Sequence, residues 1–129
     1  MIQHGFSLLE ILITLTIIVI IAGFCFPIYS QHIVDERRLE AKIALEKLAA
    51  DLEKYYSIHN TYQGATLENL DFPPNIANNQ YHLAITTLTE TTFSLTAAPI
   101  QQEALCGTLL VDSTGRKGIT GTGKLSDCW

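Results

Sequence analysis

The feature that most constrains this chain is an apolar run near its N-terminus, GFSLLEILITLTIIVIIAGF, that contains one ionised side chain, Glu10. As a helix rising 1.5 Å per residue, residues 6–28 would extend about 34 Å. That length crosses the hydrocarbon core of a bilayer, which is about 30 Å thick. A charged side chain is unfavourable in hydrocarbon, so such a residue is a functional candidate. The run therefore predicts a membrane helix with one carboxylate of functional interest.

A cleaved secretory signal peptide is the alternative interpretation of this run. Signal peptides have a basic N-terminal region, a shorter apolar core and an A-x-A cleavage site. Residues 1–5 contain no Lys or Arg, the apolar run is too long, and IAGFCFP offers no A-x-A. A retained helix is therefore favoured. The positive-inside rule does not orient it, because no basic residue lies on its N-terminal side.

Two cysteines near the C-terminus predict a disulfide. Cys106 and Cys128 enclose a loop of about twenty residues, for which the chain-entropy model gives about 3 kcal/mol of stabilisation. Such bridges persist in oxidising compartments such as the periplasm or the cell surface. The alternative is a pair of free thiols in a cytosolic protein, and the membrane-type N-terminus favours the disulfide. Cys25, inside the apolar run, is expected to be a small packing residue.

The helical pattern continues beyond the apolar run. Apolar residues recur at steps of three and four, which is typical of an amphipathic helix: Val34, Ala41, Leu45, Leu48, Leu52 and Tyr55. One nearly continuous helix is predicted over residues 6–58. Pro27 removes a backbone hydrogen bond within it, and Gly23, one turn earlier, lowers helix propensity further. We therefore expect a helix break at Gly23 and Pro27.

The remainder of the chain predicts a small antiparallel sheet, and the fold class is α+β. Residues 59–80 are rich in Asn, Gly and Pro and are expected to be mostly loop. Alternating apolar residues over 81–98 predict two strands, residues 108–111 a third, and the segment around Ile119 a weak fourth. The apolar face of this sheet of three to four strands should pack on the helix stripe.

The motif GFSLLE ahead of a long apolar helix resembles the processing site of type IV pilins and pseudopilins. The resemblance implies that a prepilin peptidase cuts between Gly5 and Phe6, and that Phe6 is then N-methylated. Glu10 matches the glutamate of that family, and Pro27 matches the helix-breaking proline of type IVa pilins. The C-terminal pattern, CGTLLVDSTG through to DCW, resembles the disulfide-bounded loop of PilE-type minor pilins.

The resemblance implies a type IV pilin fold and a domain order. Residues 1–5 would be a leader, residues 6–30 a membrane-spanning and filament-core helix, and residues 31–129 a globular domain that is periplasmic before assembly. The expected function is that of a structural subunit, minor rather than major, held in the inner membrane until it joins the pilus. Such a pilus supports adhesion, twitching motility or DNA uptake. The implied partners are other pilin subunits, the prepilin peptidase and the inner-membrane assembly platform.

The resemblance also gives Glu10 a role in assembly. Cleavage creates a positive amine on Phe6, and the glutamate of an incoming subunit is expected to meet the amine of a subunit already in the filament. Removing one partner of a buried ion pair costs about 3–5 kcal/mol. Only one axial register of the subunits satisfies both charges, so the pair can set the subunit stagger. The alternative is an ordinary anchor, whose Glu10 lies at the headgroups or pairs with its own N-terminus one turn away.

Two other classes of protein were weighed. A type II secretion pseudopilin shares the N-terminal motif, but the loop between Cys106 and Cys128 favours a pilin. Nothing supports an enzyme, a cofactor or a metal site. The segment GRKGITGTGK lacks the P-loop arrangement, and the histidines lack metal-ligand spacing. These histidines are His4, His32, His59 and His82.

The charge balance gives little support for nucleic-acid binding. The net charge of −5 and the absence of a marked basic patch argue against general binding of phosphates. A narrower possibility is a small basic tip formed by Arg116, Lys117 and Lys124 that contacts DNA or another surface. Three charges alone give only weak phosphate binding.

Overall fold

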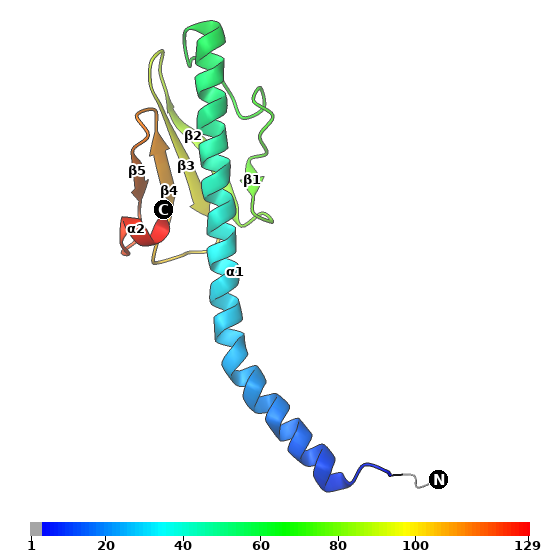
Figure 1. The fold of residues 1–129 in the computed structure, drawn as a ribbon. Coiled ribbons are helices and arrows are strands. Elements are labelled where there is room, and N and C mark those ends of the chain that lie inside the picture. The colour runs from blue at the N-terminus through cyan, green and yellow to red at the C-terminus, as the bar shows by residue number, and fades with distance from the viewer. Residues whose placement is uncertain (1–3) are drawn as a thin grey trace. The chain divides into compact units, whose positions relative to one another are not determined.

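The computed structural model describes residues 4–129. A long helix is followed by a five-stranded antiparallel sheet and a short C-terminal helix (Figure 1). The chain divides into two compact units, and the division falls between Asp35 and Glu36. The predicted α+β fold is confirmed in its main elements: one long helix, a small antiparallel sheet and a C-terminal disulfide.

Helix α1 spans Leu8–His59, close to the predicted range of 6–58. The helix assignment runs through Gly23 and Pro27 without interruption. Because a proline has no N–H to donate, the turn before Pro27 lacks one backbone hydrogen bond. A break at these two residues stays a prediction about the assembled filament.

The first unit consists of a short extended segment and the N-terminal part of α1. From Phe6, which is 83% exposed, to Tyr29, its large apolar side chains are exposed, whereas Ile33 and Val34 are half-buried. This part of α1 is long and apolar enough to cross a membrane. Exposed apolar patches of this size mark contact with a membrane or another protein. The side chains of this unit therefore fit a lipid environment or a bundle of similar helices.

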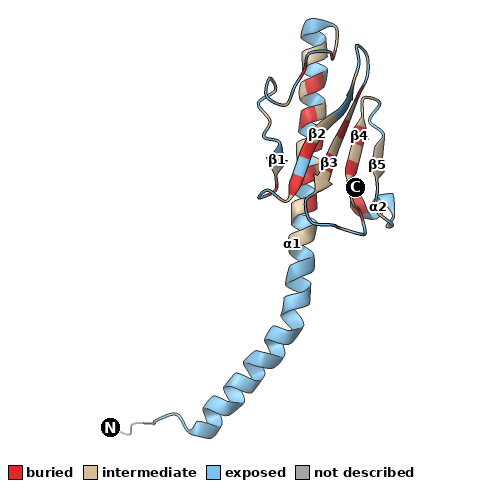
Figure 2. Ribbon diagram, turned by 180° about the vertical axis from the view of Figure 1, so that it is seen from behind, coloured by how far each residue is buried: buried red, intermediate tan, exposed pale blue. Residues whose placement is uncertain are grey.

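The second unit has a core between one face of α1 and the sheet. Buried positions on α1 recur at steps of three or four residues, as the sequence predicts: Ala41, Leu45, Leu48 and Leu52. From the sheet, Leu83, Leu95 and Leu109 join them with no exposed area. Figure 2 shows the buried residues where α1 and the sheet face each other. The amphipathic stripe is thereby covered, as predicted.

The sheet has the sequential order β1-β2-β3-β4-β5, and each neighbouring pair is antiparallel. The strands are β1 (Asn75–Ile76), β2 (Tyr81–Leu88), β3 (Phe93–Pro99), β4 (Leu109–Asp112) and β5 (Lys117–Ile119). The count is five rather than three to four, because β1 lies in the segment that was expected to be loop. A strand of two residues, next to a Pro-Pro pair, has no alternation for the sequence to reveal.

Strand β2 is only partly paired on its outer side. Strand β1 pairs with Tyr81 and His82, and the Leu83 N–H donates to the Pro74 carbonyl at 2.7 Å. Within residues 4–129, no strand lies beside the rest of that edge. On the inner side, the register with β3 shifts between Ile85 and Thr87, which marks a β-bulge. The bulge interrupts the alternation of inward and outward side chains at the middle of β2.

The C-terminal segment is held to the sheet by the predicted disulfide. Cys106 and Cys128 form a bridge between residues 22 positions apart. Cys128 is the last residue of the short helix α2 (Leu125–Cys128), and both cysteines are fully buried. The remaining cysteine, Cys25, is a free thiol on the exposed part of α1.

Candidate functional site

The N-terminal motif forms a capping box at the start of α1. The Ser7 hydroxyl accepts a hydrogen bond from the Glu10 N–H at 3.2 Å, and the Glu10 carboxylate accepts one from the Ser7 N–H at 3.4 Å. This reciprocal pair satisfies two backbone donors of the first turn. In the free chain Glu10 is thus bonded to its own N-terminal segment.

The predicted processing site lies just outside that helix. Gly5 and Phe6 precede α1 and are exposed, so the bond between them is accessible. Of the predicted leader, residues 1–3 lie outside the described part of the chain. The capping box places Glu10 one turn from Phe6, which is compatible both with the anchor interpretation and with exchange onto a neighbouring subunit.

A second group of functional candidates lies at β5 and the C-terminus. The Lys117 ammonium is 2.9 Å from the Glu46 carboxylate of α1 and 4.7 Å from the centre of the Trp129 ring. The indole N–H of Trp129 donates to the Gly118 carbonyl at 3.0 Å. Trp129 directly follows the disulfide-bonded Cys128. Disulfide, indole and lysine therefore form one connected cluster.

The turn before β5 presents Arg116 to solvent. One carboxylate oxygen of Asp112 accepts hydrogen bonds from the N–H of Thr114 at 2.9 Å, from its hydroxyl at 2.5 Å, and from the N–H of Arg116 at 3.0 Å. The bond from the Thr114 hydroxyl is the main reason that the pKa of Asp112 is lowered. Gly115 has φ of 81°, a conformation that favours glycine. These hydrogen bonds fix the conformation of the turn, and they also hold the backbone of the exposed Arg116 in place.

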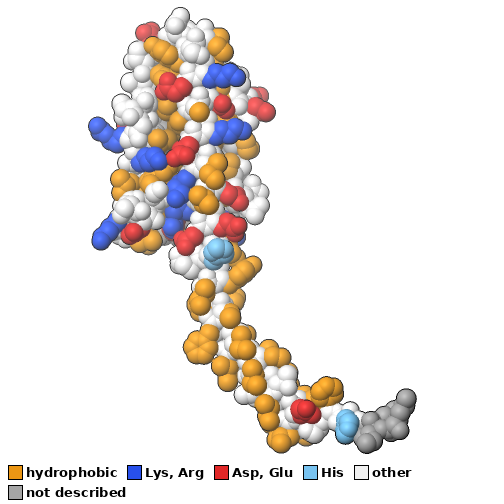
Figure 3. All heavy atoms as spheres, viewed as in Figure 1, with side chains coloured by type: hydrophobic (Ala, Val, Ile, Leu, Met, Phe, Trp, Pro, Cys, Tyr) orange, Lys and Arg blue, Asp and Glu red, His pale blue; other side chains and the backbone are white. Residues whose placement is uncertain are grey.

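Positive charge is confined to two parts of the chain. Residues 55–112 contain no Lys or Arg but five carboxylates. The cations lie either on α1 or in residues 116–124: Arg37, Arg38, Lys42, Lys47, Lys54, Arg116, Lys117 and Lys124. In Figure 3 the Lys and Arg side chains gather over the second half of α1 and along the edge formed by β5 and α2. On the second half of α1 these cations alternate with as many carboxylates, so cations outnumber carboxylates only in residues 113–129.

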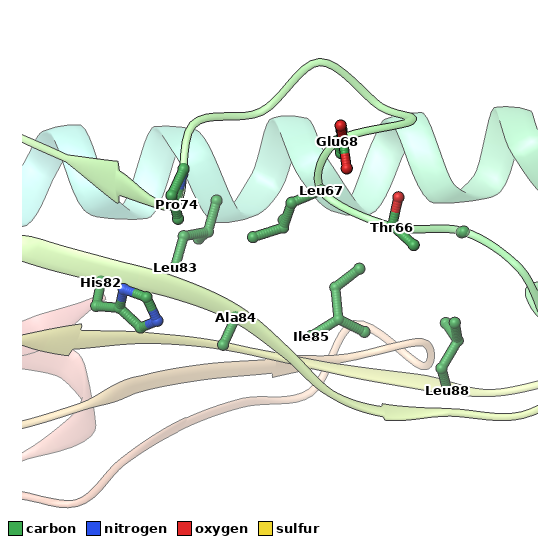
Figure 4. A pocket seen from close by; sticks show the side chains of 10 residues that line it. Thr66, Leu67, Glu68, Pro74, His82, Leu83, Ala84, Ile85 and Leu88 are labelled. Atoms are coloured by element: carbon green, nitrogen blue, oxygen red, sulfur yellow. The ribbon is translucent and has the colours of Figure 1, made fainter.

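A groove of about 500 Å³ lies along β2 (Figure 4). Its walls are mainly apolar, and the side chains that the figure shows there include Leu67, Pro74, Leu83, Ile85 and Leu88. Glu68 contributes a carboxylate, and the His82 ring is 3.1 Å from the Asn75 side chain. No Lys or Arg lines this groove, which makes it a poor site for a phosphate backbone.

The histidines are not arranged as metal ligands. Among residues 4–129, no group of three or more His, Cys, Asp or Glu side chains could hold a metal ion. The ring of His59 instead stacks on Tyr55 at 4.0 Å between ring centres, and its Nδ1 lies 3.0 Å from the Tyr55 carbonyl oxygen.

An internal ion pair was not predicted from the sequence. Arg38 is 5% exposed and forms an ion pair with Glu103 from the connection between β3 and β4. The Tyr81 hydroxyl donates to the other oxygen of Glu103 at 3.0 Å. A charged residue on the inner face of an amphipathic helix was the available signal, since a buried charge requires a partner.

Comparison with known proteins shows the family to which this chain belongs. The model of the family described as "Type IV minor pilin ComP, DNA uptake sequence receptor" matches residues 27–110, more than half of the chain. The chain belongs to this family of type IV minor pilins. A prokaryotic N-terminal methylation motif matches residues 1–26, which supports the predicted motif at the start of this minor pilin. Such a pilin is anchored in the inner membrane and later assembled into the pilus.

Two solved structures resemble this minor pilin. The non-core minor pilin PilV of Neisseria meningitidis has a TM-score of 0.54 at 19% identity, over 69% of this chain and 91% of that chain. A type IV pilin of Shewanella oneidensis has a TM-score of 0.47 at 28% identity, over 74% of this chain and 96% of that chain. The first supports the shared fold. No curated protein sequence matched this chain.

Proposed function

We propose that this minor pilin binds DNA at the edge formed by β5 and α2 and supports DNA uptake through the pilus. The family it belongs to is described as a receptor for a DNA uptake sequence. The observation that carries the proposal is the segregation of charge. Residues 113–129 hold Arg116, Lys117 and Lys124 against one side-chain carboxylate, Asp127, whereas residues 55–112 hold no cation.

The geometry of this edge suits a phosphate backbone. Arg116 comes just before β5, Lys117 begins it, and Lys124 follows five residues after its end, so the three cations are spread along one edge of the sheet. Arg116 and Lys124 are exposed. A backbone extending along this edge would meet positive charge at each of these positions.

Binding of labelled duplex DNA to the full-length protein in non-ionic detergent tests this proposal. Replacing Arg116 and Lys124 by Gln should weaken binding, and each lost phosphate contact should reduce the salt slope of log K by about 1. Lys54→Gln, at the C-terminal end of α1, is the control that also removes one positive charge, and it should change the salt slope of log K little. If Lys54→Gln weakens DNA binding as much as Arg116→Gln or Lys124→Gln does, the DNA does not bind at the edge formed by β5 and α2.

A second part of the proposal concerns processing and assembly. The leader would be residues 1–5, cut between Gly5 and Phe6, with Phe6 methylated, residues 6–30 in the membrane and residues 31–129 in the globular domain. The exposure of Gly5 and Phe6 supports the proposed cleavage between them. The amine of Phe6 would pair with Glu10 of a neighbouring pilin subunit, and Gly23 and Pro27 would let the helix break there. The prepilin peptidase and the assembly platform are the proposed partners, and no catalytic activity or cofactor is proposed.

Mass spectrometry of sheared filaments and cell envelopes tests this second part. A chain that begins at methylated Phe6 in the filaments is expected, at a low ratio to the major subunit. A processed chain found only in the envelope would instead indicate a pseudopilin, the alternative that the comparisons do not favour. An uncut chain would contradict the proposed cleavage.

A further inference from the structure

Lys117, one of the cations of the β5 and α2 edge, has an anionic partner on α1. Its ammonium lies 2.9 Å from the Glu46 carboxylate. The side chains of Lys117 and Glu46 are 38% and 59% exposed, so water reaches both. Exposed ion pairs of this kind contribute little to stability and exchange readily.

The Trp129 ring also lies close to the Lys117 ammonium. The ring centre is 4.7 Å from the Lys117 Nζ, within the range of a cation–π interaction. The ring is itself fixed, since its N–H donates to the Gly118 carbonyl and its neighbour Cys128 is bridged to Cys106. The ammonium therefore keeps a defined position when its carboxylate partner leaves.

We propose that Lys117 is a phosphate-binding residue with a built-in competitor, Glu46, which a DNA phosphate replaces. The inference rests on the proposed DNA binding and adds how that site is regulated. Carboxylate and phosphate oxygens are both strong acceptors for an ammonium, so one can take the place of the other. Trp129 acts as the positioning residue, and Glu46 lowers the affinity for DNA by occupying Lys117 in the free protein.

Binding of a fluorescein-labelled duplex to full-length protein in detergent, followed by anisotropy, separates these contributions. Glu46→Gln should tighten binding about two- to five-fold, the range expected for an exposed ion pair. Glu40→Gln removes the same charge from an exposed position of the same helix, and it should have a smaller effect. In a Lys117→Gln background, Glu46→Gln should have no more effect than Glu40→Gln.

Trp129 supplies an independent readout because it is the only tryptophan in the chain. Displacement of the Glu46 carboxylate changes the charge beside the indole, so unlabelled duplex should shift its fluorescence in the wild type. In Lys117→Gln the shift should be lost even at DNA concentrations that saturate binding.

The outcomes distinguish the two proposals. A wild type that binds DNA, with equal effects of Glu46→Gln and Glu40→Gln, overturns the role of Glu46 and leaves the proposed function standing. A fluorescence shift that persists in Lys117→Gln also overturns it. A wild type that does not bind duplex DNA overturns the proposed function, and this inference with it.

Discussion

Arg38 of α1 and Glu103 of the connection between β3 and β4 form an ion pair across 65 residues of sequence, inside the globular unit. The Tyr81 hydroxyl donates to the same carboxylate at 3.0 Å. Three separate parts of the chain, α1, the start of β2 and the segment after β3, are thereby joined at one point. Burial raises the pKa of Tyr81, although the nearby Arg38 acts in the opposite direction.

Glu103→Gln should destabilise the globular unit by about 2–4 kcal/mol. The variant leaves the Arg38 charge buried without its carboxylate, and breaking a buried pair typically costs about 3–5 kcal/mol. The exposure of Glu103, 15% of its side chain, reduces that value. Urea unfolding of the full-length protein in detergent measures the change. Tyr81→Phe keeps the ion pair and should lose only about 1 kcal/mol; an equal loss from both variants would contradict this ranking.

The Tyr62 hydroxyl should ionise at a higher pH than the hydroxyl of a free tyrosine. Burial first, and then its hydrogen bond to Glu53 at 2.9 Å, raise its pKa from 10.0 to about 12. The native state therefore favours the protonated phenol. Its stabilising contribution is complete below pH 10 and is lost as the pH rises toward 12. In a titration of tyrosinate absorbance, Tyr62→Phe should remove signal near pH 12, and loss of signal near pH 10 instead would contradict the assignment.

Removing the disulfide should destabilise the globular unit by about 3 kcal/mol, the value expected for a loop of this length. The double variant Cys106→Ser, Cys128→Ser would be compared with wild type in denaturant. Because Trp129 follows Cys128, its fluorescence should also become more like that of a solvated indole. Cys25→Ser, at an exposed position, is the control and should stay within about 0.5 kcal/mol.

Substitutions at Ser7 and Glu10 should separate helix capping from subunit assembly. Glu10→Ala removes the charge and the hydrogen bond that the carboxylate accepts from the Ser7 N–H, whereas the bond from the backbone N–H of residue 10 to the Ser7 hydroxyl remains. We expect a processed membrane protein that enters filaments poorly. Ser7→Ala removes the hydroxyl of the cap but keeps the carboxylate, so incorporation should stay near wild type. Immunoblots of sheared filaments and membranes give the ratio. If Glu10→Ala enters filaments normally, Glu10 has no role in assembly. If both variants lose incorporation equally, the loss is due to the missing helix cap.

The sequence predicted those elements that rest on local patterns. The periodic positions of Leu45, Leu48 and Leu52 identified the buried face of α1, and alternation located β2 and β3. The spacing of Cys106 and Cys128 in a membrane-anchored chain was enough to favour their bridge. The GFSLLE motif indicated the family because it is specific and continuous in the sequence.

Contacts between distant residues could not be predicted in the same way. Lys117 meets Glu46 across 71 residues, and nothing in the segment around either residue indicates the other. From the sequence, the basic tip could therefore be described only as three charges. The Glu46 carboxylate and the Trp129 indole beside Lys117 could not be predicted. The Arg38 pair was missed for the same reason, and β1 was missed because it is two residues long.

The β-bulge between Ile85 and Thr87 has a consequence for the unassembled subunits. An open strand edge is a template for aggregation, since its free backbone groups can pair with those of another chain. Among residues 4–129, no strand pairs with the outer edge of β2 beyond Leu83, whose own N–H donates to the Pro74 carbonyl. A bulge increases the local twist of its strand, so two such edges do not lie flat against each other. The bulge therefore disfavours edge-to-edge pairing of two subunits along β2.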